Sequence, residues 1–369
     1  MSENKKYIQH NGYRIYLSSV SPVACQNCFI QTTLEICHLF FQNHTSLLIE
    51  NYGMDTTKMI FDHSQRSQII PNFEFQNKEK NSRNEKIMKK SGKTNLFLSP
   101  QIMTIRKDKT IYSILTDIYK NDKLAFTNGL DHIIYKVKGS EEYPPTLDCK
   151  INQNLEDFNG LNNPFHYSCM VCISSSKGQS SGKMSLLENF DYHFDFIKTL
   201  VDNRGKFPLE KQKKDADYTV LDNLNIELVN QEISKKYFGI KDIRLLKWVE
   251  IDLNPGDVLI FDCRIPYKIE KNDIDIPVMY IPISLRPVPQ NWYKSRKHSN
   301  LVNAIKNGKV GDWNKKTFKG SNIDEYRWRT QQNYLDFAKL ENCINNLKFE
   351  DGEQFIFGLK QYELSKYEH

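Results

Sequence analysis

The residue pattern that most directly suggests metal chemistry in this chain is the triplet His193-Phe194-Asp195. A histidine and a carboxylate two residues apart on a strand, joined by a second histidine from elsewhere, can hold ferrous iron and leave positions for oxygen and a cosubstrate. The neighbouring apolar residues recur at helical spacing, however, and predict a helix over residues 184–203. Residues two apart on a helix point about 200° apart. We therefore interpret His193 as a residue of a helix face and keep the iron site as the alternative.

Two Cys-x-x-Cys pairs, Cys25/Cys28 and Cys169/Cys172, suggest a zinc site or a disulfide. The distance between the pairs along the chain far exceeds the spacing of zinc ribbons. The second pair also lies in an apolar run, residues 165–173, and on a strand its two thiols would point to opposite faces. The pattern favours reduced, partly buried thiols in an intracellular protein.

Composition narrows the function classes further. The chain has 369 residues, of which 26% are charged and 39% hydrophobic, with a net charge of +6. Its clearest basic cluster, residues 78–93, is interleaved with acidic and polar side chains, so we predict a solvated loop and no nucleic-acid partner. The sequence contains no run of eighteen apolar residues, so we expect no membrane span. The N-terminus lacks a secretory core, and we expect a cytoplasmic or mitochondrial protein.

The order of expected elements indicates an α+β chain with a mostly β core. Helices are predicted from Pro22 to about Asn43 and over 111–119, and Tyr143-Pro144-Pro145 is interpreted as a break. Residues 63–97 and 206–247 are expected to be loops or insertions. Strands are predicted over 12–17, 133–137 and 165–173, and as a closing pair over 257–262 and 278–285.

The last of these segments carries a resemblance to a known family. Residues 264–267 read Arg-Ile-Pro-Tyr, Asn272 follows five residues later, and residues 275–278 read Asp-Ile-Pro-Val. This segment resembles the C-terminal half of the phytanoyl-CoA dioxygenase family, whose members use ferrous iron and 2-oxoglutarate. Two upstream landmarks fit the same register: residues 147–152, and Gly182 followed by the aromatic stretch 189–194.

The resemblance implies a double-stranded β-helix, similar to a jelly roll or cupin, flanked by helices. It covers residues 8–289 and leaves residues 290–369 as a mostly helical C-terminal extension. It also implies where the iron ligands would stand. Asp148 and Lys150 replace the first His and the Asp, Tyr267 replaces the distal His, and Pro277 or Val278 replaces the Arg that holds 2-oxoglutarate. A lysine ammonium has no lone pair for a metal. We therefore expect neither iron nor 2-oxoglutarate as a cofactor.

Because the residues that bind iron and 2-oxoglutarate in this family are replaced, we expect a pseudoenzyme. We expect it to serve as an accessory or structural subunit of a larger intracellular complex, with a mitochondrial complex as one candidate. Two alternatives stay open: an active iron/2-oxoglutarate oxygenase, and a small-molecule binding module in the emptied barrel. The C-terminal extension holds aromatic residues of the kind that are enriched at protein interfaces. The candidate contacts with partner subunits are Trp292, Trp313, Tyr326, Trp328 and Tyr334.

Overall fold

The structure is a computed structural model, and it describes part of the chain. The described residues are 8, 12–40, 93–94, 100–120, 124–125, 133–148, 167–175, 181–187, 219–220, 247–263, 265–274, 277–283, 285–287, 294 and 299. None of the helices within these ranges combines the length and the apolar composition that a bilayer crossing requires.

Two antiparallel sheets face each other and form the core. The six-stranded sheet has the order β1-β10-β6-β12-β4-β2, and the five-stranded sheet has the order β8-β5-β11-β7-β9. The strands of the first are β1 (Tyr13–Tyr16), β2 (Lys93–Thr94), β4 (Ile133–Lys136), β6 (Tyr167–Ser174), β10 (Val258–Asp262) and β12 (Val278–Ile283). Those of the second are β5 (Tyr143–Leu147), β7 (Met184–Leu187), β8 (Thr219–Val220), β9 (Trp248–Ile251) and β11 (Tyr267–Ile269).

Along much of its length the chain alternates between the two sheets. From β4 to β7 the chain changes sheet at every strand, and from β9 to β12 it does so again. All the strand pairings are antiparallel. Two facing antiparallel sheets with such crossings form a jelly roll. A separate two-stranded pairing joins β3 (Leu124–Ala125) to β13 (Arg286–Pro287).

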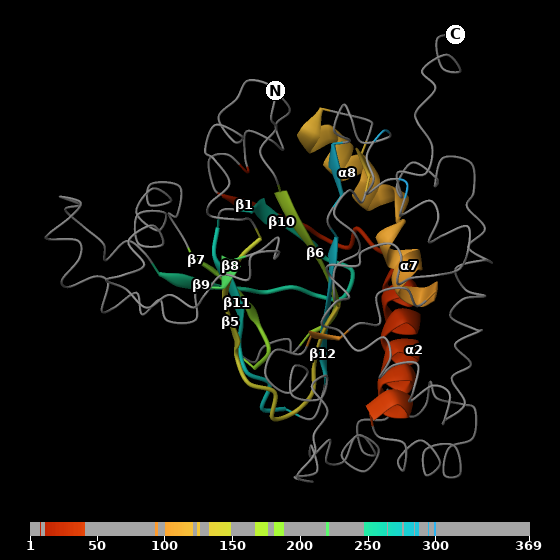
Figure 1. Cartoon of the computed structure of the whole chain (residues 1–369), viewed down its shortest axis with the longest axis vertical. Coiled ribbons are helices and arrows are strands. Elements are labelled where there is room, and N and C mark those ends of the chain that lie inside the picture. The colour runs from red at the N-terminus through yellow and green to blue at the C-terminus, as the bar shows by residue number, and fades with distance from the viewer. Residues whose placement is uncertain are drawn as a thin grey trace, which may run out of the picture.

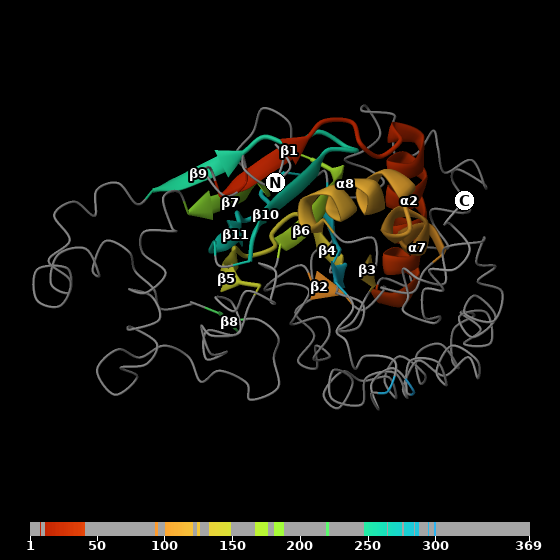
Figure 2. The same ribbon diagram turned by 90° about the horizontal axis from the view of Figure 1, so that it is seen from above.

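Three helices lie on the outer side of the six-stranded sheet, opposite the five-stranded one (Figures 1 and 2). They are α2 (Pro22–Phe40), α7 (Pro100–Arg106) and α8 (Lys109–Tyr119). The α2 helix contacts β6, and Tyr135 in β4 meets Thr33 of α2 with 2.8 Å between their hydroxyl oxygens. Tyr119 at the end of α8 packs edge-on against Tyr167 of β6.

The central strands of the six-stranded sheet are mostly apolar because both faces are covered. Every residue of β6 and of β10 is buried. Helices cover one face and the second sheet covers the other, so a mostly apolar run replaces the alternating pattern of a strand that exposes one face to solvent. The thiols of Cys169 and Cys172 in β6 are buried, and so are those of Cys25 and Cys28 in α2.

Two local predictions were wrong. Residues 184–187, expected to begin a helix, form β7 and pair with β11 and β9; the remainder of the predicted helix lies outside the described residues. Tyr143-Pro144-Pro145, interpreted as a break, belongs to β5. The register shifts there, since Tyr143 pairs with Ile269 and Thr146 with Tyr267. The two prolines lie where the register shifts. A proline has no backbone N–H, and at such a position no hydrogen bond between the strands is lost.

The predicted closing pair was also wrong in one respect. Both strands exist, as β10 and β12, but β6 lies between them and pairs with each. The link between them contributes β11 to the other sheet. Two short strands, β2 and β8, fall within the segments predicted to be loops or insertions; β2 pairs with β4 and β8 with β5.

Candidate functional site

Asp148 and Tyr267 meet inside this fold, although 119 positions separate them in sequence. Tyr267 opens β11 and pairs with Thr146 in β5. Asp148 follows β5 directly and lies two residues beyond Thr146, and residues two apart on an extended chain project to the same side. The Tyr267 side chain is hydrogen-bonded to the Asp148 side chain. The two positions that the resemblance assigns to the first and the distal iron-binding histidine are therefore neighbours.

Tyr267 lies in an aromatic cluster. Its ring stacks on Tyr143, with 5.7 Å between ring centroids and 13° between ring planes, and meets the edge of Phe261 at 5.5 Å. Only 4% of Tyr267 is exposed. Burial, reinforced by the charge of Asp148 and by Tyr143, raises the pKa of Tyr267 well above its ordinary value. At neutral pH Tyr267 is therefore a neutral phenol, and its hydroxyl is hydrogen-bonded with the side chains of Tyr143 and Asp148.

These residues do not fit ferrous iron. A metal site of the expected kind needs two neutral imidazoles and a carboxylate on one side of the ion. Here a protonated phenol stands at one position, and the carboxylate at another already accepts its hydrogen bond. Within the described part of the chain, no group of three His, Cys, Asp or Glu side chains could hold a metal ion. Lys150 and the alternative ligands His193 and Asp195 lie outside the described residues.

Val278 stands at the position where the resemblance puts the 2-oxoglutarate-binding arginine. It is fully buried at the start of β12 and pairs with Lys136 of β4. Gly182 lies against it so closely that a Cβ added at Gly182 would come within 2.6 Å of Val278 Cγ2. The space beside β12 is thus filled by an apolar contact between the two sheets.

A residue that the sequence analysis did not single out, Lys136, places a charge-bearing group inside the barrel. Opposite residues of an antiparallel pair project to the same face, so Lys136 shares the face of Val278. The next inward residue of β12, Tyr280, donates to the Gly182 carbonyl at the edge of the second sheet, whereas Tyr135 faces α2. Lys136 therefore points between the sheets, and none of its surface is exposed.

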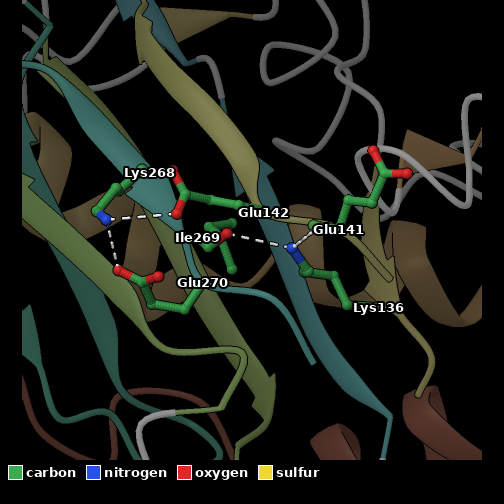
Figure 3. Close-up of polar contacts among 6 residues, drawn as sticks. All are labelled: Lys136, Glu141, Glu142, Lys268, Ile269 and Glu270. Atoms are coloured by element: carbon green, nitrogen blue, oxygen red, sulfur yellow. Dashed lines mark hydrogen bonds and ion pairs between the residues drawn. The ribbon is translucent and has the colours of Figure 1, made fainter. Parts of the chain in front are cut away.

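The Lys136 amine reaches across the barrel to main-chain carbonyls (Figure 3). Its Nζ donates to the Ile269 carbonyl of β11 at 3.1 Å and to the Glu141 carbonyl at 2.5 Å. Burial lowers the pKa of Lys136 to about 7, although Glu142, Glu270 and Glu141 act in the opposite direction. The first two of these carboxylates are instead paired with Lys268 on the outer face of the sheet, at 3.5 and 2.7 Å.

The sequence did contain a signal for Lys136. A single lysine interrupts an otherwise apolar strand, Ile133-Ile134-Tyr135-Lys136-Val137. In a strand with one wet face such a residue would point to solvent, and only the covering of both faces turns it into a buried amine. The predicted interface residues Trp292, Trp313, Tyr326, Trp328 and Tyr334 all lie outside the described residues.

No protein-family model matches this chain, and no curated protein matches it either. Similar solved structures include the GlcNAc Inducible Gene 2 protein of Candida albicans, with 12% identity, a TM-score of 0.48, and coverage of 93% of this chain and 82% of that one. The epimerase SnoN, solved with Fe3+, alpha ketoglutarate and nogalamycin RO, has 10% identity, a TM-score of 0.39, and coverage of 77% and 82%. A Pseudomonas putida prolyl-4-hydroxylase has 6% identity, a TM-score of 0.33, and coverage of 75% and 94%. All three TM-scores are below 0.5, so these similarities do not assign a function to this chain. Its fold is assigned from the order of its strands.

Proposed function

We propose that this chain is a non-catalytic relative of the phytanoyl-CoA dioxygenase family, in which a double-stranded β-helix that no longer binds iron through the family's positions serves as an accessory subunit. The observation that carries the proposal is the contact between Tyr267 and Asp148. The Tyr267 hydroxyl is buried in an aromatic setting and is hydrogen-bonded with the Asp148 side chain. A metal entering this site would have to break that bond and take a proton from a phenol whose pKa is raised.

Val278 supports the same proposal from the cosubstrate side. An arginine clamp for a carboxylate needs room for a planar, two-pronged guanidinium. At this position a buried valine is packed against Gly182 instead. The metal-binding residues and the cosubstrate-binding arginine are thus replaced together, as expected of a chain that no longer catalyses the family's reaction.

The accessory role rests on the C-terminal extension. Residues 290–369 follow the last strand of the jelly roll and hold three of the four tryptophans, together with many lysines and tyrosines. Such a mixture suits an interface with an apolar centre and a charged rim. We propose an intracellular assembly, with a mitochondrial complex as one candidate.

The experiment that tests the lost chemistry is 2-oxoglutarate turnover to succinate under iron and oxygen. We expect no turnover above a no-protein control for the natural chain. We also expect none for the combined variant Asp148→His, Lys150→Asp and Tyr267→His, because Val278 offers no cation for the cosubstrate carboxylate. Iron-dependent succinate formation by the natural chain would overturn the proposal and favour the active oxygenase. Loss of that activity in His193→Ala would then identify His193 as a ligand.

A further inference from the structure

Three turns meet at the end of the barrel where Lys136 lies. The first joins β4 to β5 (residues 137–142), the second leads into β7 at Gly182, and the third follows β11 (residues 270–274). The buried side chain of Asn272 ties them together. Its Nδ2 donates to the Lys136 carbonyl at 2.8 Å, and its Oδ1 accepts from Ser181 Oγ at 3.0 Å. Main-chain hydrogen bonds from Gly139 to Asn272 and from Asn272 to Ser140 complete the closure.

Lys136 adds a buried amine to this closure, beside the Tyr280 hydroxyl, which donates to the Gly182 carbonyl. Its amine holds the Glu141 carbonyl of the first turn and the Ile269 carbonyl of β11 together. An ammonium buried among carbonyls loses its hydration, and it is stabilised fully only when a carboxylate pairs with it. No described carboxylate forms an ion pair with Lys136, since Glu142 and Glu270 turn outward to Lys268.

We propose that Lys136 is a proton-operated latch: the neutral amine holds the β4–β5 turn against β11, and proton uptake by this amine favours an open end of the barrel. The other charged groups nearby are Glu141, Glu142 and Lys138 on the turn, and Lys268, Glu270 and Lys271 along β11 and its extension. The neighbouring strand β12 presents Val278 beside Lys136. This inference concerns the end of the barrel with Lys136 and does not depend on whether iron binds near Asp148.

The direction of the effect follows from the two environments of the amine. In the closed end the pKa of Lys136 is about 7, and in an open, hydrated end it returns to the ordinary 10.5. The open state therefore binds the proton more tightly, and acidification drives opening. Between these two pKa values the opening equilibrium rises up to tenfold for each unit that pH falls, and below pH 7 it levels off.

Hydrogen exchange of the amides at Gly139, Ser140 and Asn272 reports this opening. In the full chain, after correction for intrinsic exchange rates, we expect their opening constants to rise about 50-fold as pH falls from 9 to 7. The amide of Leu187, which donates to the Pro266 carbonyl near the other end of β7, should lack this dependence. Lys136→Met should abolish the dependence, and Lys138→Met, a change of the neighbouring exposed lysine, should preserve it.

Two further measurements keep the proposal falsifiable if Lys136→Met fails to fold. Nitrogen NMR of the lysine amines in the natural chain should show one amine titrating near neutral pH, and Glu142→Gln or Glu270→Gln should move that titration to lower pH. The proposal is overturned if Lys136 titrates near its ordinary value in the folded protein. It is equally overturned if protection of the three amides is independent of pH, or if Lys136→Met keeps the full dependence.

Discussion

Tyr267 illustrates how the surroundings of one side chain decide its chemistry. A tyrosine phenolate can bind a metal, but this phenol is buried between aromatic rings and faces a carboxylate. Both features disfavour the charged form. The same two features make the residue a contributor to stability, because the folded protein holds its proton more tightly than the unfolded chain does.

Tyr267→Phe tests this contact. Loss of the hydroxyl removes its hydrogen bond with Asp148, and we expect the free energy of unfolding to fall by about 1 to 2 kcal/mol at neutral pH. Because the pKa of Tyr267 is raised, its contribution is complete below about pH 10 and is lost as pH rises further, so the variant should also be less sensitive to alkali. Denaturant unfolding measures both effects. In a double-mutant cycle with Asp148→Ala, strictly additive losses would contradict a direct contact.

At the scale of strands and turns, the contact between Gly182 and Val278 fixes how closely the two sheets approach at this end. Gly182 has φ +69° and leads directly into β7, and Val278 opens β12 in the opposite sheet. Gly139 provides a natural comparison, since it has a similar φ of +77° but would have nothing within 4 Å of an added Cβ.

Gly182→Ala and Gly139→Ala separate backbone strain from this close approach. Both alanines suffer from the positive φ, which costs about 1 to 2 kcal/mol. Only the alanine at 182 also collides with Val278, and we expect a further loss of about 1 to 3 kcal/mol. Thermal or denaturant unfolding gives the difference, and Val278→Ala in the Gly182→Ala background should recover part of it. Equal losses for the two glycines would show that the sheets have room to separate.

Some helices and strands of this fold could be predicted from their own residue patterns, and others could not. The strands β6, β10 and β12 were predictable because their apolar runs are bounded by turn residues. The helices α2 and α8 were predictable from their helical spacing, and α2 also from its start at Pro22. The start of α8 was not predicted; there Asp108 caps the helix by accepting from the amides of Thr110 and Ile111. In contrast, β7 has only four residues, and the helical spacing of the residues that follow it led to the wrong prediction of a helix.

The candidate site was predictable in part for a similar reason. Local spacing could not bring Asp148 to Tyr267, because strand pairing across more than a hundred residues does so; the landmarks of the resemblance located both positions. The burial of Lys136 depends on two layers that cover β4 from opposite sides. No pattern within five residues of sequence contains that information.

At the scale of the whole molecule, the central question is what residues 290–369 do. A jelly roll is complete once β12 pairs with β4 and β6, so a further 80 residues exceed what closure of the core requires. Two roles account for them: an interface with partner subunits, or a cover for the chain's own barrel.

Truncation after Pro289 distinguishes these roles. We expect the shortened chain to keep a cooperative unfolding transition near that of the full chain and to leave the high-mass fraction of a native extract in which the full chain elutes. Size-exclusion chromatography with light scattering measures the second effect, and combined replacement of Trp313 and Trp328 by alanine tests it without truncation. A shortened chain that unfolds, from a parent that elutes as a monomer, would favour the cover.

The metal content of the full-length protein tests the central claim most directly. The chain should be purified without oxygen in the presence of ferrous iron, then freed of loosely bound metal, and its iron counted by elemental analysis. We predict far less than one iron per chain, with no increase on addition of 2-oxoglutarate. One firmly bound iron per chain, lost when His193 and Asp195 are replaced by alanine, would contradict the account and establish an iron site elsewhere than at Asp148 and Tyr267.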